Sequence, residues 1–164
     1  MTRQRTAELR HVAGETFEAA TGSGRRMVFG DRAEAAELSP VETLAVALAA
    51  CSAMDVVSIL AKKRMSFDSY RIRVVADQRD EPYPQVFTRV DVVHEVEGPR
   101  ITEAAVRRAI ELSATKYCPV SAMVAAGETI VHHRYRVSCT GPEPLDVEGE
   151  AAVTGPWRRD VAPA

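Results

Sequence analysis

Two of the three cysteines occupy positions at which a thiol could take part in chemistry. Cys51 lies within a run of alanines, and Cys118 directly precedes Pro119, where a short helix is expected to begin. Unpaired N–H groups at a helix start stabilise a thiolate, so a reactive thiol is predicted at Cys118, with a role as a weak helix cap as the alternative. A free cysteine among alanines is usually a small core residue, and this interpretation stays open for Cys51. Cys139, at the end of an expected strand, is interpreted as incidental.

The four histidines show no spacing that is typical of a metal centre. Zinc sites usually take pairs of Cys or His ligands at short separations, and the sequence has no such pairs. His132 and His133 are adjacent, but neighbouring residues of a strand point to opposite faces of its sheet. The sequence also contains no glycine-rich phosphate loop and no nucleophile-elbow motif. The pattern therefore predicts no metal site.

A strong helix start precedes Cys51. Ser39 can cap the helix, Pro40 suits its first position, and Glu42 completes a capping box three residues after Ser39. The helix is expected to run from Pro40 to about Arg64, where a basic cluster complements the negative end of the helix dipole. Glu42 is also a candidate site residue, with capping as the simpler explanation.

Segment 43–61 of this helix is almost entirely apolar or small, as a membrane span would be. Asp55 lies inside it, and a carboxylate at the centre of a span costs about 2.5–3.5 kcal/mol. We therefore expect no membrane insertion and a helix that is buried on most sides in a protein interior. The strands of one small chain supply too little cover for such a helix, which favours a dimer in which two of these helices share a core.

The other expected elements give an α+β layout. Apolar residues that alternate with charged ones predict strands, and Thr102 is expected to cap a second helix. The expected elements are short strands with glycine turns within 6–30, strands over 70–76, 86–97 and 130–137, a helix after Thr102, and a short helix over 118–126.

Length and composition fit one domain, expected over residues 1–138, followed by a loosely packed tail over 139–164 that is proline-rich and acidic. Trp157 is expected to hold part of this tail in place. The formal net charge is −2 and no basic face is evident, which argues against binding of nucleic acid. The chain starts without an apolar signal stretch and has few cysteines, so a cytoplasmic protein with free thiols is expected.

Two ordered segments, each containing one of the two cysteines, resemble the OsmC/Ohr family of osmotically inducible and organic hydroperoxide resistance proteins. The first segment contains SPVETL (39–44), ALAAC (47–51) and DVVSILAKKR (55–64). The second runs from RAIELS (108–113) into KYCPVSAM (116–123). The resemblance extends over about residues 6–137, and the DVV and KKR details are similar to an OsmC-like subgroup.

The resemblance implies an intertwined α+β homodimer, with an OsmC-like fold, that reduces organic or hydrogen peroxides with thiols. The residue matching Cys51 is the peroxidatic thiol in the family, and the residue matching Cys118 is the resolving thiol. An external dithiol would reduce the resulting disulfide. The resemblance implies no bound cofactor, whether metal, flavin or nicotinamide.

Family members activate the peroxidatic thiol with an arginine that a glutamate supports. Val41 stands at the position of that glutamate in the hydroperoxide enzymes, and Glu42 is one residue further along the helix. The arginine is not identified by its surroundings, and the candidates are Arg10, Arg25, Arg26 and Arg32. Two other functions therefore stay open: an OsmC-like dimer that binds a small ligand or senses oxidants without efficient turnover, and a purely structural oligomer.

Overall fold

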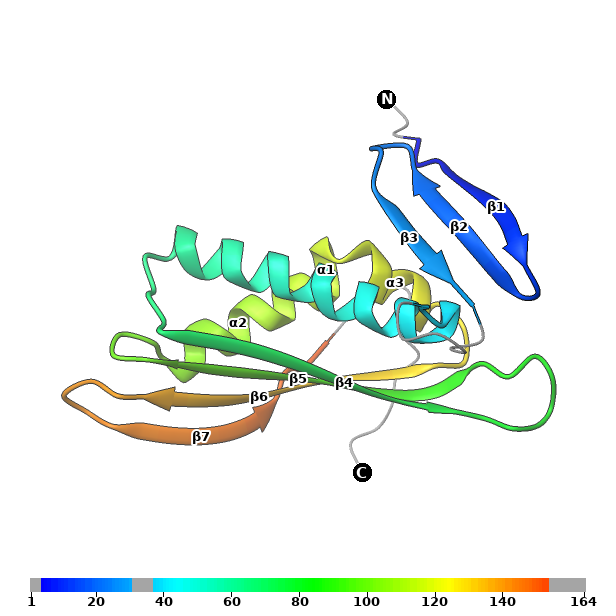
Figure 1. The fold of residues 1–164 in the computed structure, drawn as a ribbon. Helices are drawn as coiled ribbons and strands as arrows, with labels where there is room; N and C mark the ends of the chain where they lie inside the picture. The colour runs from blue at the N-terminus through cyan, green and yellow to red at the C-terminus, as the bar shows by residue number, and fades with distance from the viewer. Residues whose placement is uncertain (1–3, 31–36, 154–164) are drawn as a thin grey trace. The chain divides into compact units, whose positions relative to one another are not determined.

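The computed structural model describes residues 4–30 and 37–153, and the chain forms two compact units, Met1–Leu44 and Ala45–Ala164. The first unit contains a three-stranded antiparallel sheet (Figure 1), formed by β1 (Ala7–Ala13), β2 (Thr16–Thr21) and β3 (Arg26–Phe29) in that order. Gly14 and Gly24, in the two connecting turns, have φ angles of 52° and 80°, which side chains rarely allow. The strands and glycine turns expected within 6–30 are therefore confirmed.

Helix α1 (Pro40–Lys62) carries the first cysteine, and its bounds lie close to those expected from the sequence. The N–H of Glu42 donates to Ser39 Oγ at 3.5 Å, so Ser39 caps the helix as expected. At the other end Arg64 has a φ of 58°, and the N–H of Met65 donates to the carbonyl of Leu60 at 3.0 Å. This is a Schellman-type ending, with an arginine at the position that usually holds glycine.

Three helices cover one face of the four-stranded sheet in the second unit (Figure 1). The strands lie in the order β4 (Ser69–Gln78), β5 (Phe87–Gly98), β6 (Ile130–Cys139) and β7 (Leu145–Glu150). β5 and β6 are parallel, so the chain between them must cross over the sheet. The crossover consists of α2 (Glu103–Leu112), the π-helical turn η1 (Ser113–Tyr117) and α3 (Pro119–Ala125). The α+β class and the elements expected between residues 70 and 137 are confirmed.

Alternation along the two central strands builds the core between sheet and helices. Every second residue of β5 faces the helices, and β6 repeats this pattern beside it. The buried residues of the two strands are Val90, Val92, His94, Val96, Val131, His133, Tyr135 and Val137. The side chains of His133 and His132 lie on opposite faces, as expected, since His133 is buried and His132 pairs with Glu150 on β7.

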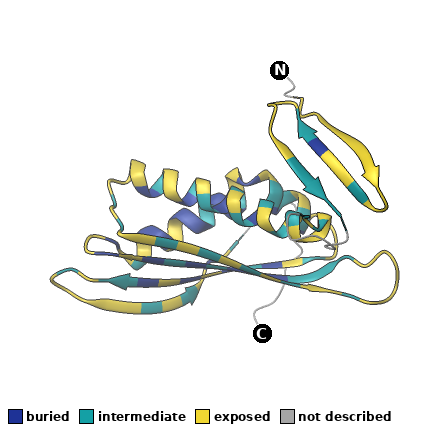
Figure 2. Ribbon diagram, viewed as in Figure 1, coloured by how far each residue is buried: buried dark blue, intermediate teal, exposed yellow. Residues whose placement is uncertain are grey.

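Among the residues that the structure describes, helix α1 is buried along one face, whereas the sequence predicts burial on most sides (Figure 2). The buried residues follow each other at intervals of four: Leu48, Ser52, Val56 and Leu60. Val46 and Met54, on another face, are 65% and 74% exposed. The physical reason is that one sheet and its crossover can cover a single face of a helix. Helix α1 is also long and apolar enough to cross a membrane, but the core helix of a soluble protein meets the same criterion.

The expectation of a loosely packed tail after Cys139 is wrong for residues 145–150, which form β7 along the edge of the sheet. The acidic residues of this strand are balanced by arginines of β6, since Arg136 Nη2 lies 2.9 Å from Asp146 Oδ2. An acidic composition that favours disorder in isolation is thus compatible with a paired strand. Trp157 lies outside the described residues.

Candidate functional site

Three side chains with chemically reactive or metal-binding atoms converge within the second unit. Cys51 and Asp55 are one helical turn apart on α1 and therefore project from the same side of the helix. Cys118 comes from the junction between η1 and α3. The two Sγ atoms and a carboxylate oxygen of Asp55 all lie within 4.8 Å of one another. The fold thus brings together two sulfur atoms that the sequence keeps 67 residues apart.

The backbone around Cys118 fixes its sulfur towards the start of α3. Cys118 is the N-cap residue of this helix, and the N–H of Ser121 donates to Cys118 Sγ at 3.3 Å. The pKa of the Cys118 thiol is raised to about 12, chiefly by burial and also by the neighbouring Cys51, against the lowering effect of the Ser121 N–H. Burial therefore opposes the thiolate predicted at Cys118, and the side chain caps the helix as the alternative interpretation expects.

The carboxylate of Asp55 is oriented by a residue of the crossover. Ser113, the first residue of η1, is fully buried, and its Oγ donates to Asp55 Oδ2 at 3.0 Å. A π-helical turn changes the direction in which successive side chains point, and such turns are frequent at functional sites. The same turn therefore supplies the partner of Asp55 and leads directly into Cys118.

A layer of polar side chains lies beneath α1, and it begins at the residue that follows Cys51. Ser52 is fully buried, and its Oγ lies 3.5 Å from His94 Nε2. The other ring nitrogen of His94 is 2.7 Å from the hydroxyl of Tyr70 on β4. Burial lowers the pKa of His94 to about 4, so this histidine is neutral at physiological pH.

A second buried histidine continues this polar layer to the other cysteine. The rings of His94 and His133 are stacked, with centroids 6.0 Å apart and planes inclined by 28°. His133 Nε2 lies 3.3 Å from the hydroxyl of Ser121, whose N–H binds Cys118. Hydrogen-bonding side chains therefore lie next to both cysteines.

Glu42 is the predicted site residue that the structure does not bring to the sulfurs within one chain. Its N–H contacts the Ser39 cap, and its side chain is exposed. Cys51 follows nine residues later on the same helix, a rise of about 14 Å and a rotation of about half a turn. A catalytic role for Glu42 stays a prediction.

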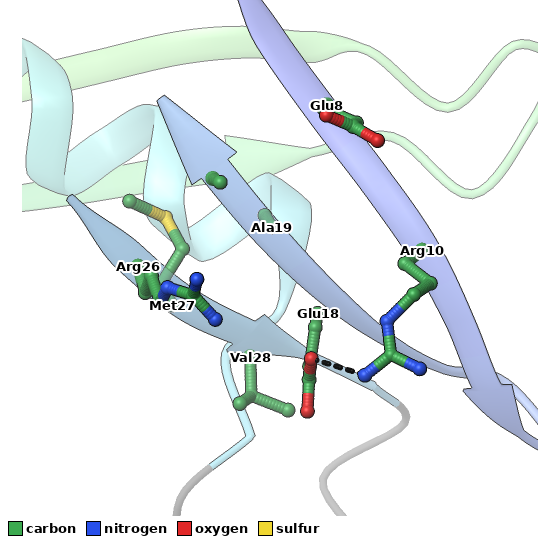
Figure 3. Close-up of a pocket in the computed structure, with 8 residues that line it drawn as sticks. Glu8, Arg10, Glu18, Ala19, Arg26, Met27 and Val28 are labelled. Atoms are coloured by element: carbon green, nitrogen blue, oxygen red, sulfur yellow. Dashed lines mark hydrogen bonds and ion pairs between the residues drawn. The ribbon is translucent and has the colours of Figure 1, made fainter. Parts of the chain in front are cut away.

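The candidate arginines belong to the first unit or to residues that the structure does not describe. Arg10 pairs with Glu18 at 2.6 Å along a pocket of about 390 Å³ on the β1–β3 sheet, which Arg26 also lines (Figure 3). Arg25 is exposed, and Arg32 lies outside the described residues. The arginine that would act on Cys51 is therefore not identified.

Asp55 and the buried histidines carry no strong signal in the sequence. Asp55 could have been found from its spacing, because a residue four positions after Cys51 must share its helix face. His94 and His133 come from strands that are distant in sequence, and only the parallel pairing of β5 with β6 places them side by side. The prediction of no metal site rests on the spacing of Cys and His residues in the sequence, and it stays a prediction.

Comparison with known proteins agrees with this fold. Residues 32–133 match the family model described as OsmC-like protein. The chain is 35% identical over 126 residues to Protein YhfA of Escherichia coli (strain K12), an alignment that covers 77% of this chain and 93% of that protein. The chain therefore belongs to the OsmC-like protein family, and the resemblance seen in its sequence is confirmed.

Solved structures show the same architecture. A hypothetical protein from Aquifex aeolicus VF5 is 27% identical with a TM-score of 0.74, and the match covers 84% of this chain and 98% of that one. An organic hydroperoxide resistance protein from Elizabethkingia anophelis is 14% identical with a TM-score of 0.63, covering 85% and 99%. At 14% identity the second match shows a shared fold alone.

Proposed function

We propose that the protein reduces peroxides, with Cys51 as the attacking thiol and Cys118 as the resolving thiol. The observation that carries the proposal is the approach of the two Sγ atoms to within 4.8 Å in the folded chain. Membership of the OsmC-like family and the resistance to organic hydroperoxides named for a structural neighbour support a role connected with peroxides.

The first step oxidises Cys51. Its thiolate sulfur attacks one oxygen of the peroxide, the O–O bond breaks, and an alcohol, or water from hydrogen peroxide, leaves with a proton. Sulfur gives two electrons to the peroxide and becomes a sulfenic acid. Cys51 suits this step better than Cys118 because it is only partly buried, whereas Cys118 is 3% exposed.

The second step joins the two cysteines. The Cys118 sulfur attacks the Cys51 sulfenic sulfur, a disulfide forms, and the hydroxyl group leaves as water together with the Cys118 proton. A disulfide needs a separation of about 2.05 Å, so the sulfurs must come at most about 3 Å closer. An external dithiol then returns two electrons and two protons and restores both thiols.

Peroxide consumption by cysteine variants tests this proposal. Wild-type protein with a small dithiol is expected to consume cumene hydroperoxide over many turnovers, and Cys51→Ser to fall to the rate without protein. Cys118→Ser should complete one oxidation and then recycle poorly. Cys139→Ser is the matched control and should behave as wild type, since its sulfur is held near Pro99 O rather than in the cluster.

Turnover at the wild-type rate in Cys51→Ser would contradict the role of Cys51. Unchanged multi-turnover activity in Cys118→Ser would contradict the resolving role alone.

A second candidate function is binding of a small ligand or sensing of oxidants without efficient turnover. It is favoured by Val41 in place of the glutamate of the hydroperoxide enzymes, and by the carboxylate of Asp55 close to both sulfurs, because a negative neighbour disfavours a thiolate. The pH dependence of Cys51 alkylation distinguishes the two. A midpoint close to that of a free thiol supports binding or sensing, and a midpoint well below it supports the peroxidase.

We further propose that the chain acts as a homodimer. Val46, Ala50 and Met54 are exposed at intervals of four along α1, and such an apolar stripe is suited to burial against a second copy. This exposed face of α1 is the feature of the described residues that supports a dimer.

A further inference from the structure

We propose that the reduced protein binds one Zn²⁺ ion through Cys51, Asp55 and Cys118. Each of these residues offers one donor atom, and the three atoms lie within 4.8 Å of one another. The inference stands on these three ligands and does not depend on the proposed reduction of peroxides.

The separation of the donor atoms is close to what a tetrahedral zinc ion requires. Zinc binds thiolate sulfur at about 2.3 Å and carboxylate oxygen at about 2.0–2.2 Å, so its ligand atoms lie about 3.6–3.8 Å from one another. From separations of at most 4.8 Å, side-chain rotations that shift each donor atom by about 1 Å bring all three atoms to these distances. The backbone therefore does not have to rearrange.

The chemistry of the donors selects the metal. Two thiolates and one carboxylate suit Zn²⁺, whereas Mg²⁺ and Ca²⁺ prefer oxygen ligands. Three protein ligands leave a fourth position for water, as in zinc sites that keep an open position. Once both thiols are deprotonated the three ligands carry three negative charges, and the ion neutralises two of them.

Contacts behind the ligands already orient them. The Ser113 hydroxyl donates to Asp55 Oδ2 at 3.0 Å, and the Ser121 N–H donates to Cys118 Sγ at 3.3 Å. Hydrogen bonds of this kind behind metal ligands fix their direction and raise metal affinity. Cys51 and Asp55 in addition share one helix face, which sets their separation without help from the rest of the fold.

Binding has a chemical consequence for the thiols. Zn²⁺ displaces the protons of Cys51 and Cys118 to solvent and occupies the sulfur electron pair that would attack a peroxide. A zinc-bound protein is therefore expected to be protected from oxidation at these two cysteines.

Equilibrium dialysis of the reduced chain against Zn²⁺ tests the site directly. Wild type is expected to bind one ion per chain. Cys51→Ser, Cys118→Ser and Asp55→Asn are each expected to weaken binding at least about tenfold, because losing a direct ligand lowers metal affinity more than losing a hydrogen bond behind a ligand. Cys139→Ser and Asp68→Asn, which changes an exposed aspartate between α1 and β4, are the matched controls and should bind as wild type. Circular dichroism shows whether each variant is folded.

A measurement on unsubstituted protein keeps the test independent of folding of the variants. Zn²⁺ should slow iodoacetamide labelling of Cys51 and Cys118, and leave labelling of Cys139 unchanged, when the sites are quantified by peptide mass spectrometry. Absence of stoichiometric Zn²⁺ in reduced wild type, or equal protection of all three cysteines, would overturn the proposal. Since no peroxide is present, neither result bears on the peroxidase.

Discussion

Cys51 and Cys118 differ in their surroundings although their sulfurs are close. Cys118 is buried, and its pKa is raised to about 12, chiefly by desolvation. Cys51 is only partly buried, and both sulfurs lie close to the carboxylate of Asp55. The structure therefore divides the two thiols into a more accessible one and a protonated, enclosed one.

This difference predicts the order in which the native thiols are alkylated. At neutral pH iodoacetamide should label Cys51 at least about tenfold faster than Cys118, because a buried thiol with a raised pKa is almost entirely protonated. Peptide mass spectrometry after brief labelling measures both rates, and labelling in urea provides the control in which they become similar. Faster native labelling of Cys118 would contradict the assignment.

His94 predicts how stability depends on pH. Burial lowers its folded-state pKa to about 4, against about 6.5 in the unfolded chain, so the unfolded chain takes up a proton first as pH falls. The contribution of His94 to the free energy of unfolding is complete above about pH 6.5. It is lost as the pH falls from about 6.5 to 4, and the loss amounts to at most about 3 kcal/mol. The facing groups are Tyr70 and His133, and burial raises the pKa of Tyr70, so Tyr70 stays uncharged in this range.

Urea unfolding at a series of pH values measures this dependence. His94→Gln removes the titrating group and keeps a polar side chain, so its stability should change less between pH 6.5 and 4. An equal slope in His94→Gln and wild type would show that other groups cause the loss.

At the scale of elements, the end of α1 predicts a stabilising substitution. Arg64 holds a φ of 58°, where a side chain costs about 1 kcal/mol relative to glycine. Arg64→Gly is therefore expected to raise the free energy of unfolding by up to about 1 kcal/mol, measured by urea denaturation. Arg64→Ala is the control, since alanine keeps the Cβ atom; equal gains in both variants would show that charge rather than backbone strain matters.

The elements could be predicted from the sequence wherever a local signal defines them. The Ser39 and Thr102 caps and the alternation along β4, β5 and β6 placed the helices and strands close to their observed bounds. β7 carries a short alternation of the same kind, from Leu145 to Glu148, but the proline-rich and acidic composition around it favours a loose tail, and its acidic residues gain their partners only by pairing with β6.

The convergence of the site could be predicted only through the family resemblance. The approach of Cys118 to Cys51 is set by the crossover between β5 and β6, and no spacing within the sequence encodes it. The direction of the Cys118 pKa could not be predicted either, since the helix start and burial act in opposite directions and burial depends on the fold. Asp55, by contrast, follows from helix periodicity once Cys51 is known.

At the scale of the whole molecule, the exposed apolar stripe of α1 predicts self-association. Wild type is expected to sediment as a dimer, and Met54→Glu as a monomer, because burying an unpaired carboxylate costs several kcal/mol. Val75→Glu is the matched control, since Val75 is 61% exposed on β4 and lies off the stripe. A wild-type chain that sediments as a monomer at all concentrations in analytical ultracentrifugation would contradict the dimer.

The central claim is that Cys51 and Cys118 form a bond after one of them is oxidised. Mass spectrometry of the unreduced protein after one equivalent of cumene hydroperoxide tests it most directly. We predict a loss of two hydrogen atoms per chain and a single linked peptide pair that joins Cys51 to Cys118, with Cys139 still free for alkylation. A protein that consumes the peroxide and shows no such link, or links Cys139 instead, would contradict the account.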